Sequence, residues 1–322
     1  MRRTRAVAVR ERNIRERQDP PQWGAGYVPG QLATRYEAPD ESRPATVKSF
    51  QLGRKVHCMS EPELYAFLLA SHMGRFFDLH ESRMMHPEPS AGFIHGCPGV
   101  TQTYAAAHSG TIMAAERLGL LQFHPTIRVP DQATGRTKVV AFPLLSDQLY
   151  FCRDPGGVYA VNWCIKQSAE DFEKAFNSRS PVRLRKTDEE HQARLLIEEE
   201  LYRDAGIRTI HVANTDIPPH VKHNLRSLYP YKLRESSLHE LVKEEFIQTV
   251  KARMALEAPL FETMRYFHGR YGGSLFDYQI EVCKAIWDKV IPCDLWRPIL
   301  MDGPLHPPAK SLDSHFSSWW RR

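Results

Sequence analysis

The sequence contains no run of eighteen apolar residues, the length that a membrane-spanning helix requires. Its first residues are basic and lack the long apolar segment of a secretory signal. Its six cysteines are scattered and form no C-x-x-C pair. These absences argue against a membrane partner and predict a reducing, cytoplasmic setting.

With 322 residues, 42% of them hydrophobic, the chain can build a core in one large domain or in two to three small ones. Lysine and arginine number 43 against 38 aspartates and glutamates, for a net charge of +5. This mildly basic balance permits a nucleic-acid partner without requiring one.

Residues 1–46 are predicted to form a basic, extended N-terminal arm that leads into the folded chain. Its arginines could follow a phosphate backbone, or the arm could be a solubilising tail, and both interpretations stay open. The arginines concerned are Arg2, Arg3, Arg5, Arg10, Arg12, Arg15 and Arg17.

The stretch from Lys138 to Lys166 is predicted to form two apolar strands joined by a tight turn at 154–157. Asp147 and Lys166 lie within this apolar hairpin. Burying a carboxylate or an ammonium group is costly unless the charge is paired or binds a metal. The hairpin is therefore predicted to carry a functional site.

A helix is predicted to start at Ser60, because Ser60 and Glu63 have the spacing of a capping box before an apolar run. Glu63 could therefore be a simple helix cap or a site residue. Farther along, the patterns predict a strand pair at 47–59, an insertion at about 81–119, a strand at 120–130, a helix at 189–205 and a strand at 207–213. Residues 47–230 thus read as one mixed α/β domain.

Residues 231–303 are predicted to form a small, mainly helical domain of three helices, followed by an apolar strand pair at 291–301. This order is typical of a winged-helix-like module. The last predicted helix contains only Lys284 and Lys289 as basic residues, so this domain is expected to bind protein more than DNA. The tail at 304–322 is expected to be disordered or bound to a partner.

A helix glutamate, a strand aspartate and a lysine on the next strand could form the divalent-metal site of a phosphodiesterase. Five stretches, in the family's order, resemble the TnsA-like endonuclease subunits of heteromeric, Tn-seven-type transposases, which belong to the PD-(D/E)xK nuclease superfamily; three of them contain the glutamate, the aspartate and the lysine. They are GRKVHCMSEPELYAFLL, LQFHP, LLSDQLYFCRDPGG, AVNWCIK and HQARLLIEEELYRDAGIRTIHVANTDIPPHVKHNLRSLYP. The resemblance implies a restriction-endonuclease-like mixed-sheet core followed by a winged-helix-like domain.

The resemblance implies Glu63, Asp147 and Lys166 as catalytic residues, with Glu61 as the weaker alternative to Glu63. It implies Mg²⁺, for which Mn²⁺ could substitute, held by Glu63, Asp147 and the Ile165 backbone carbonyl. Cys164 departs from the family, which has Gln at this position, and a neutral thiol is a poor Mg²⁺ ligand. Glu199, on the predicted helix at 189–205, could support the site.

By the same resemblance, this subunit would hydrolyse one strand, the 5′ strand, at each end of a mobile element during cut-and-paste transposition, close to the nucleoid. A DDE-type, TnsB-like transposase would cut the other strand, and a TnsC-like AAA+ ATPase would bind the C-terminal domain. Two alternatives stay open from the residues. One is a degenerate nuclease kept for DNA binding or assembly, and the other is a stand-alone restriction or repair nuclease.

Overall fold

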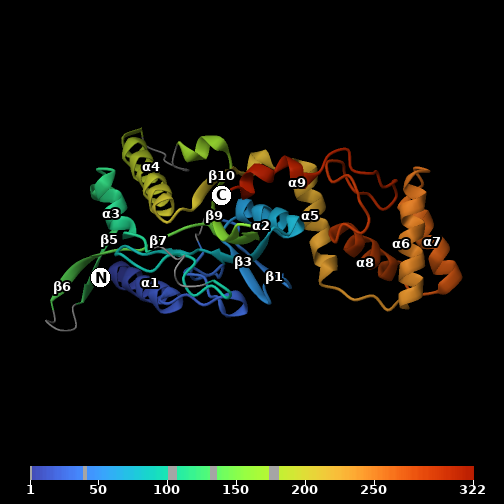
Figure 1. The fold of residues 1–322 in the computed structure, drawn as a ribbon, viewed down its shortest axis with the longest axis horizontal. Helices are drawn as coiled ribbons and strands as arrows, with labels where there is room; N and C mark the ends of the chain where they lie inside the picture. The colour runs from blue at the N-terminus through green and yellow to red at the C-terminus, as the bar shows by residue number, and fades with distance from the viewer. Residues whose placement is uncertain (1, 39–41, 101–106, 131–135, 174–180) are drawn as a thin grey trace. The chain divides into compact units, whose positions relative to one another are not determined.

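The computed structural model describes residues 2–38, 42–100, 107–130, 136–173 and 181–322 as a mixed α/β protein (Figure 1). The chain divides into two compact units. The first comprises Met1–Ala66, Arg75–Asp216 and Trp319–Arg322, and the second comprises Phe67–Gly74 and Ile217–Ser318. No helix in the described ranges is long and apolar enough to cross a membrane.

The main sheet of the first unit has four strands in the order β10-β9-β8-β3. The strands are β3 (Phe76–Glu81), β8 (Gln148–Asp154), β9 (Gly157–Lys166) and β10 (Arg208–Ala213). Strands β3, β8 and β9 pair antiparallel, whereas β10 pairs parallel to β9. A parallel pair needs a crossover connection. Helix α4 (Pro181–Asp204) lies in the connection between β9 and β10.

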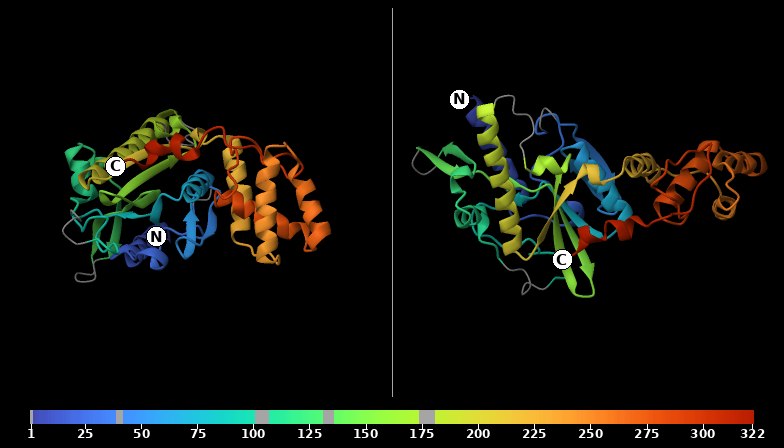
Figure 2. Two further views of the ribbon diagram at one scale, coloured as in Figure 1. Left: turned by 45° about the vertical axis from the view of Figure 1, so that its right-hand side comes forward. Right: turned by 90° about the horizontal axis from the view of Figure 1, so that it is seen from above.

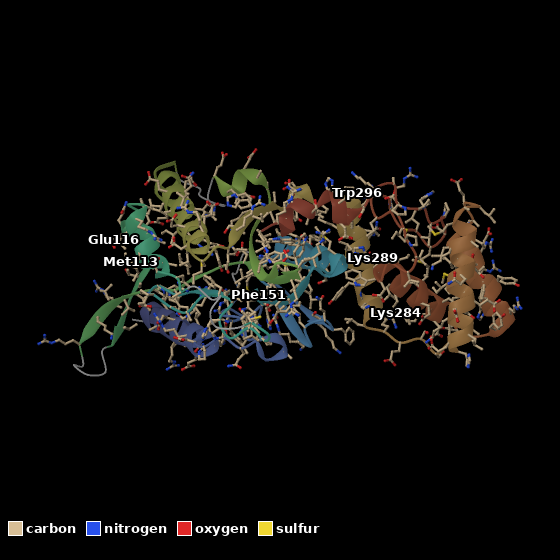
Figure 3. All side chains as sticks on the ribbon, viewed as in Figure 1. Met113, Glu116, Phe151, Lys284, Lys289 and Trp296 are labelled. Atoms are coloured by element: carbon tan, nitrogen blue, oxygen red, sulfur yellow. The ribbon has the colours of Figure 1, made fainter. Side chains whose placement is uncertain are left out.

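The predicted hairpin is confirmed over β8 and β9, which Figure 2 shows as two adjoining strands. The first strand predicted from Lys138 is not continuous, because Thr137–Ala141 and Leu144–Leu145 form separate short strands that pair elsewhere, and Asp147 lies just before β8. Their pairing runs from Gln148 opposite Trp163 to Asp154 opposite Gly157. Gly157 has a φ of 107°, a conformation that favours glycine at the turn. Phe151, labelled in Figure 3, is buried in the middle of β8. The apolar residues therefore form a core strand pair, as their pattern predicts.

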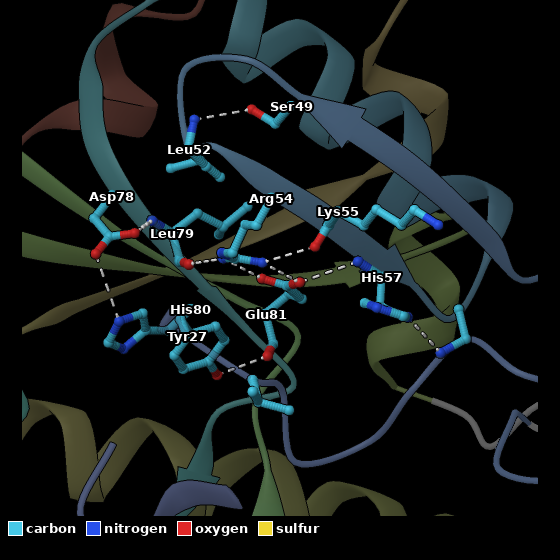
Figure 4. Close-up of polar contacts among 12 residues, drawn as sticks. Tyr27, Ser49, Leu52, Arg54, Lys55, His57, Asp78, Leu79, His80 and Glu81 are labelled. Atoms are coloured by element: carbon cyan, nitrogen blue, oxygen red, sulfur yellow. Dashed lines mark hydrogen bonds and ion pairs between the residues drawn. The ribbon is translucent and has the colours of Figure 1, made fainter. Parts of the chain in front are cut away.

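Strand β3 is absent from the sequence prediction, because its sequence FFDLHE carries three polar residues that are all buried. Figure 4 shows the polar contacts of Glu81 with Arg54 and of Asp78 with Leu79 and His80. Arg54 donates to both carboxylate oxygens of Glu81, at 2.7 and 2.8 Å, and the Gly24 amide donates to Asp78 at 2.8 Å. The His80 ring stacks on Tyr27 at 3.9 Å between centroids. Partners from distant segments thus satisfy the carboxylates of Asp78 and Glu81 in the core, whereas the two ring nitrogens of His80 have no hydrogen-bond partner among the described residues.

Helix α1 (Arg2–Gln18) replaces the predicted extended arm. Ile14 and Gln18 are buried, and the side-chain oxygen of Gln18 accepts hydrogen bonds from Arg83 and from the Met84 amide, each at 3.2 Å. This segment is therefore helical and packed on the first unit. The prediction of an extended arm is wrong over residues 2–18, because Ile14 and Gln18 are buried and Arg17 pairs with Glu37, so one face of this charged helix has partners.

Helices α2 (Glu61–Met73) and α4 confirm the helices predicted from Ser60 and over 189–205. The predicted insertion at 81–119 contains α3 (Gly110–Arg117), while residues 101–106 lie outside the described part. Ala114 and Ala115 of α3 pack in a core cluster with Leu201 of α4, so this segment belongs to the core.

Three short strand pairs complete the first unit. They are β1 (Ala45–Ser49) with β2 (Arg54–Cys58), β4 (Met84–Met85) with β7 (Leu144–Leu145), and β5 (Thr126–Pro130) with β6 (Thr137–Ala141). The first pair confirms the strand pair predicted at 47–59. Strand β5 confirms the end of the strand predicted at 120–130, whose start is instead a short 3-10 turn at Leu121–Phe123.

The second unit is helical within the described residues. Its helices are α5 (Pro219–Lys232), α6 (Glu240–Met254), α7 (Leu260–Tyr271), α8 (Leu275–Trp287) and α9 (Leu312–His315). The three helices predicted over 235–290 are confirmed as α6, α7 and α8.

The strand pair predicted at 291–301 does not form. Asn224 of α5 takes the place of a partner strand, since its side chain donates to the carbonyls of Leu295 and Arg297 and accepts from the Ile299 amide. Proline at 292 and 298 also removes two backbone donors that a strand ladder would use. The second unit therefore lacks the strand pair of a winged helix among its described residues.

The tail at 304–322 is folded, contrary to the prediction of disorder. Leu312 and Phe316 are buried in helical turns of the second unit. The last residues belong to the first unit, where Trp163 donates to the Trp319 carbonyl at 3.1 Å and Tyr159 donates to the Trp320 carbonyl at 2.9 Å. Aromatic packing on the sheet therefore orders the end of the chain.

Candidate active site

Asp147 and Lys166 meet at one end of the β8–β9 hairpin. Antiparallel pairing brings the start of β8 beside the end of β9, so residues far apart in the sequence become neighbours. Lys166 Nζ lies 3.7 Å from Asp147 Oδ2, and the Ile165 amide donates to the same oxygen at 2.7 Å. The structure thus holds the aspartate in place through the backbone of the strand that carries the lysine.

Glu63 lies in the first turn of α2, and it is buried. Its carboxylate accepts hydrogen bonds from the Met59 amide and the Ser60 hydroxyl, each at 2.8 Å. The Gln148 side chain donates to the Glu63 carbonyl at 2.9 Å, which ties this turn to the start of β8. Glu63 therefore serves as a helix cap and is held near Asp147 at the same time.

Glu198 is the acidic residue that the sequence interpretation missed. It is buried on α4, and it accepts a hydrogen bond from the Asn162 side chain of β9 at 2.8 Å. Glu199, the residue predicted to support the site, pairs instead with His211 at 2.6 Å. The run of three glutamates at 198–200 gave no basis for choosing among them, because only the packing of α4 decides which one faces the sheet.

The charges of these residues act on one another. The charge of Asp147 raises the pKa of Lys166, so the lysine stays protonated. Burial, followed by the charge of Asp147, raises the pKa of Glu63 from 4.5 to about 8 and that of Glu198 from 4.5 to about 7. The three carboxylates thus share one electrostatic environment in which two of them tend to keep a proton.

These raised pKa values predict that the first unit loses stability as the pH rises. The folded chain keeps a proton on Glu63 that the unfolded chain releases above about pH 4.5, so this stabilisation disappears as the pH passes about 8. The loss approaches about 1.4 kcal/mol per pH unit for each proton released. Urea unfolding of wild type and Glu63→Gln between pH 5.5 and 8.5 measures the effect.

We expect Glu63→Gln to become more stable relative to wild type as the pH rises, because glutamine releases no proton. The matched control is Glu61→Gln, in the same helical turn, where the carboxylate is only half-buried. Its free energy of unfolding should run parallel to that of wild type. A constant difference between Glu63→Gln and wild type across this range would show that folding does not raise the pKa of Glu63.

The other predicted site residues occupy different surroundings. Cys164 is buried, and burial together with the charges of Glu198 and Asp147 raises its pKa well above the ordinary value, so it remains a neutral thiol. At Ile165 the structure shows an amide that donates to Asp147, and the residue pairs with Val212 in the ladder between β9 and β10.

A cleft of about 550 Å³ opens in the first unit beside these residues. Glu63 and Asp147 line it from one side, and Arg10, Glu37 and Arg194 contribute from α1, the following loop and α4. The cleft is polar and open to solvent, which suits an extended, charged substrate better than a small apolar ligand.

The carboxylates of Asp147 and Glu63 fit Mg²⁺, which prefers carboxylate oxygens as ligands. In proteins this ion usually binds one or two carboxylates and substrate phosphates, and it keeps several water ligands. Asp147 and Glu63 both line the cleft, and their mutual repulsion is of the kind that a divalent cation relieves. Within the described ranges, no three His, Cys, Asp or Glu side chains are arranged to hold a metal ion together. Any metal here would therefore rely on water and substrate for its other ligands.

No protein-family model matches the chain, and no curated protein matches it either.

Proposed function

We propose that this chain is a Mg²⁺-dependent DNA endonuclease that hydrolyses one strand at the ends of a mobile element. The observation that carries the proposal is the placement of Asp147 and Lys166 at one end of the sheet, with Glu63 lining the same cleft. The order α2-β3-β8-β9-α4-β10, with its antiparallel and then parallel pairing, supports a restriction-endonuclease-like core.

Asp147 and Glu63 are the residues that would hold Mg²⁺, and Mn²⁺ could replace it. When bound, the ion would acidify water and offset the negative charge of the phosphodiester. Lys166 keeps its proton beside Asp147 and so offers a fixed positive charge to a phosphate oxygen. Gln148 and the Ile165 amide hold Glu63 and Asp147 in position.

The proposed partners are a DDE-type transposase, which would cut the second strand, and an AAA+ ATPase, which would bind the second unit. In that unit, Lys284 and Lys289 are the lysines of α8 and the turn that follows it (Figure 3), and Lys289 pairs with Asp313 at 2.9 Å. Leu241 and Phe276, two apolar residues on α6 and α8, are 70% and 44% exposed. Two exposed apolar side chains, together with a single lysine on α8, suit a protein partner better than DNA.

The proposal is tested by incubating the purified chain with supercoiled plasmid in Mg²⁺, in Mn²⁺ and in EDTA. We expect nicked circles with either metal and intact plasmid in EDTA, and ligase should reseal the nicks because hydrolysis leaves 5′-phosphate and 3′-hydroxyl ends. An Asp147→Asn chain purified identically controls for a contaminating nuclease. Intact plasmid in all three conditions, with and without an added partner transposase, would contradict the proposal.

A further inference from the structure

Two arginines line the candidate cleft from separate helices of the first unit. Arg10 belongs to α1 and Arg194 to α4, both helices labelled in Figure 1, and both side chains are exposed. The same cleft contains Glu63 and Asp147. Guanidinium groups at the edge of a carboxylate-containing cleft are suited to a phosphate group that approaches those carboxylates.

Neither arginine has a carboxylate within hydrogen-bond distance in the described ranges. Arg10 donates to the side-chain oxygen of Gln31 at 2.6 Å, and Arg194 donates to the Leu145 carbonyl at 2.8 Å. Both acceptors are neutral. A guanidinium has five N–H donors, so each arginine keeps several for a ligand.

The nearby carboxylate of Glu37 is already occupied. Arg17 donates to both of its oxygens at 2.8 Å, and the Leu32 amide donates to it at 3.0 Å. The hydrogen bond from Arg17 is the main reason that the pKa of Glu37 is lowered. The Glu37 carboxylate is therefore paired with Arg17. The Arg10 guanidinium donates instead to the neutral side-chain amide of Gln31.

The other arginines of α1 whose side chains are described are in ion pairs. Arg12 pairs with Glu16 at 3.6 Å, and Arg15 pairs with Glu11 at 2.5 Å. Arg10 is thus the arginine of this group that lines the cleft without such a pair. Among the described side chains of the first twenty residues, Arg10 is therefore the basic residue left to bind a ligand in the cleft.

The two guanidinium groups also lie close enough to affect each other. Although Arg10 is exposed, the partial loss of hydration where its side chain lies in the cleft lowers its pKa most, the charge of Glu37 raises it, and the charge of Arg194 lowers it further. Two cations that repel each other across a cleft are stabilised by an anion bound between them. A phosphate group carries the negative charge that stabilises two such cations, and it can accept bidentate hydrogen bonds from a guanidinium.

We propose that Arg10 and Arg194 bind a backbone phosphate of the DNA strand that enters the cleft. The inference rests on the proposed nuclease function, and it makes both arginines positioning residues. Their role is to place the strand so that the neighbouring phosphodiester lies beside Asp147 and Lys166. Because an interaction with phosphate carries no base information, their contribution is the same for every DNA sequence.

The test is fluorescence anisotropy with a labelled duplex of about three helical turns in EDTA, repeated at several salt concentrations. For Arg10→Gln and for Arg194→Gln, we expect weaker binding, and the slope of log K against log salt should fall by about 0.9 for each phosphate that is no longer neutralised. Arg10→Lys and Arg194→Lys should restore much of the slope because they keep the charge. Matched controls are Arg12→Gln on α1 and Arg203→Gln on α4, which should behave as wild type.

The plasmid assay separates the two proposals. If wild type cuts DNA while Arg10→Gln and Arg194→Gln bind with the wild-type slope, the phosphate site is refuted and the nuclease stands. If the arginine variants lower the slope but wild type cuts no plasmid, with or without the partner transposase, the phosphate site stands and the nuclease is refuted. A wild-type chain that does not bind the duplex at all refutes the phosphate site, as does equal weakening by the Arg12 and Arg203 controls.

Discussion

Asp147→Asn should reduce DNA cleavage by more than about 10²-fold while leaving the fold and DNA binding intact. Loss of even an outer partner of a metal ligand costs about 10- to 100-fold in affinity or activity, and here a ligand itself loses its charge. Asparagine has the size of aspartate, and its side-chain oxygen can still accept the hydrogen bond from the Ile165 amide. The change therefore removes a charge and little else. Initial rates of plasmid nicking in Mg²⁺ measure it.

The matched control is Asp154→Asn, at the opposite end of the same hairpin. Asp154 pairs with Arg322 and accepts from the Gly156 amide, away from Glu63 and Lys166. Its nicking rate should equal that of wild type. Equal rates for Asp147→Asn and wild type, with both chains folded, would remove Asp147 from the catalytic site.

Arg54→Met should destabilise the first unit by about 3–5 kcal/mol, the range expected when one partner of a buried ion pair is removed. The Arg54 side chain is 6% exposed and that of Glu81 is 0% exposed. Without Arg54, the Glu81 carboxylate keeps only the hydrogen bond from the His57 amide, at 3.0 Å, among its described contacts. The midpoint of urea unfolding, followed by tryptophan fluorescence, measures the loss.

The double variant Arg54→Met with Glu81→Leu tests the cause. Removing both charges should recover most of the stability, because an apolar pair of similar size replaces a buried ion pair at little net cost. Arg12→Met is the surface control, since Arg12 forms an exposed pair with Glu16 and should cost less than about 1 kcal/mol. If the double variant is as unstable as the sum of its single variants, the two charges are not coupled as the structure shows.

The local features of the site were predictable from sequence, because they depend on residues that are close along the chain. Two apolar stretches on either side of the turn at 154–157 predicted the hairpin, and the spacing of Ser60 and Glu63 predicted the start of α2. Antiparallel pairing then brings Asp147 to Lys166 by geometry alone.

Strand β3 could not be predicted in this way. It carries Asp78 and Glu81 into the core, where their partners come from Gly24 and Arg54, in segments well before it in the chain. No periodicity marks such a strand, since its polar residues look exposed until their partners are known.

Pattern and spacing were enough to establish a mixed α/β chain, a hairpin with Asp147 and Lys166 at one end, a helix that starts near Glu63, and a helical C-terminal region. The choice of Glu198 over Glu199 to face the sheet came from the folded chain, as did the position of Arg10 at the cleft while its neighbours are paired. Those outcomes depend on which face of a helix packs inward. The packing of an apolar core sets that face, and a difference of one residue turns a side chain by about 100° around the helix axis.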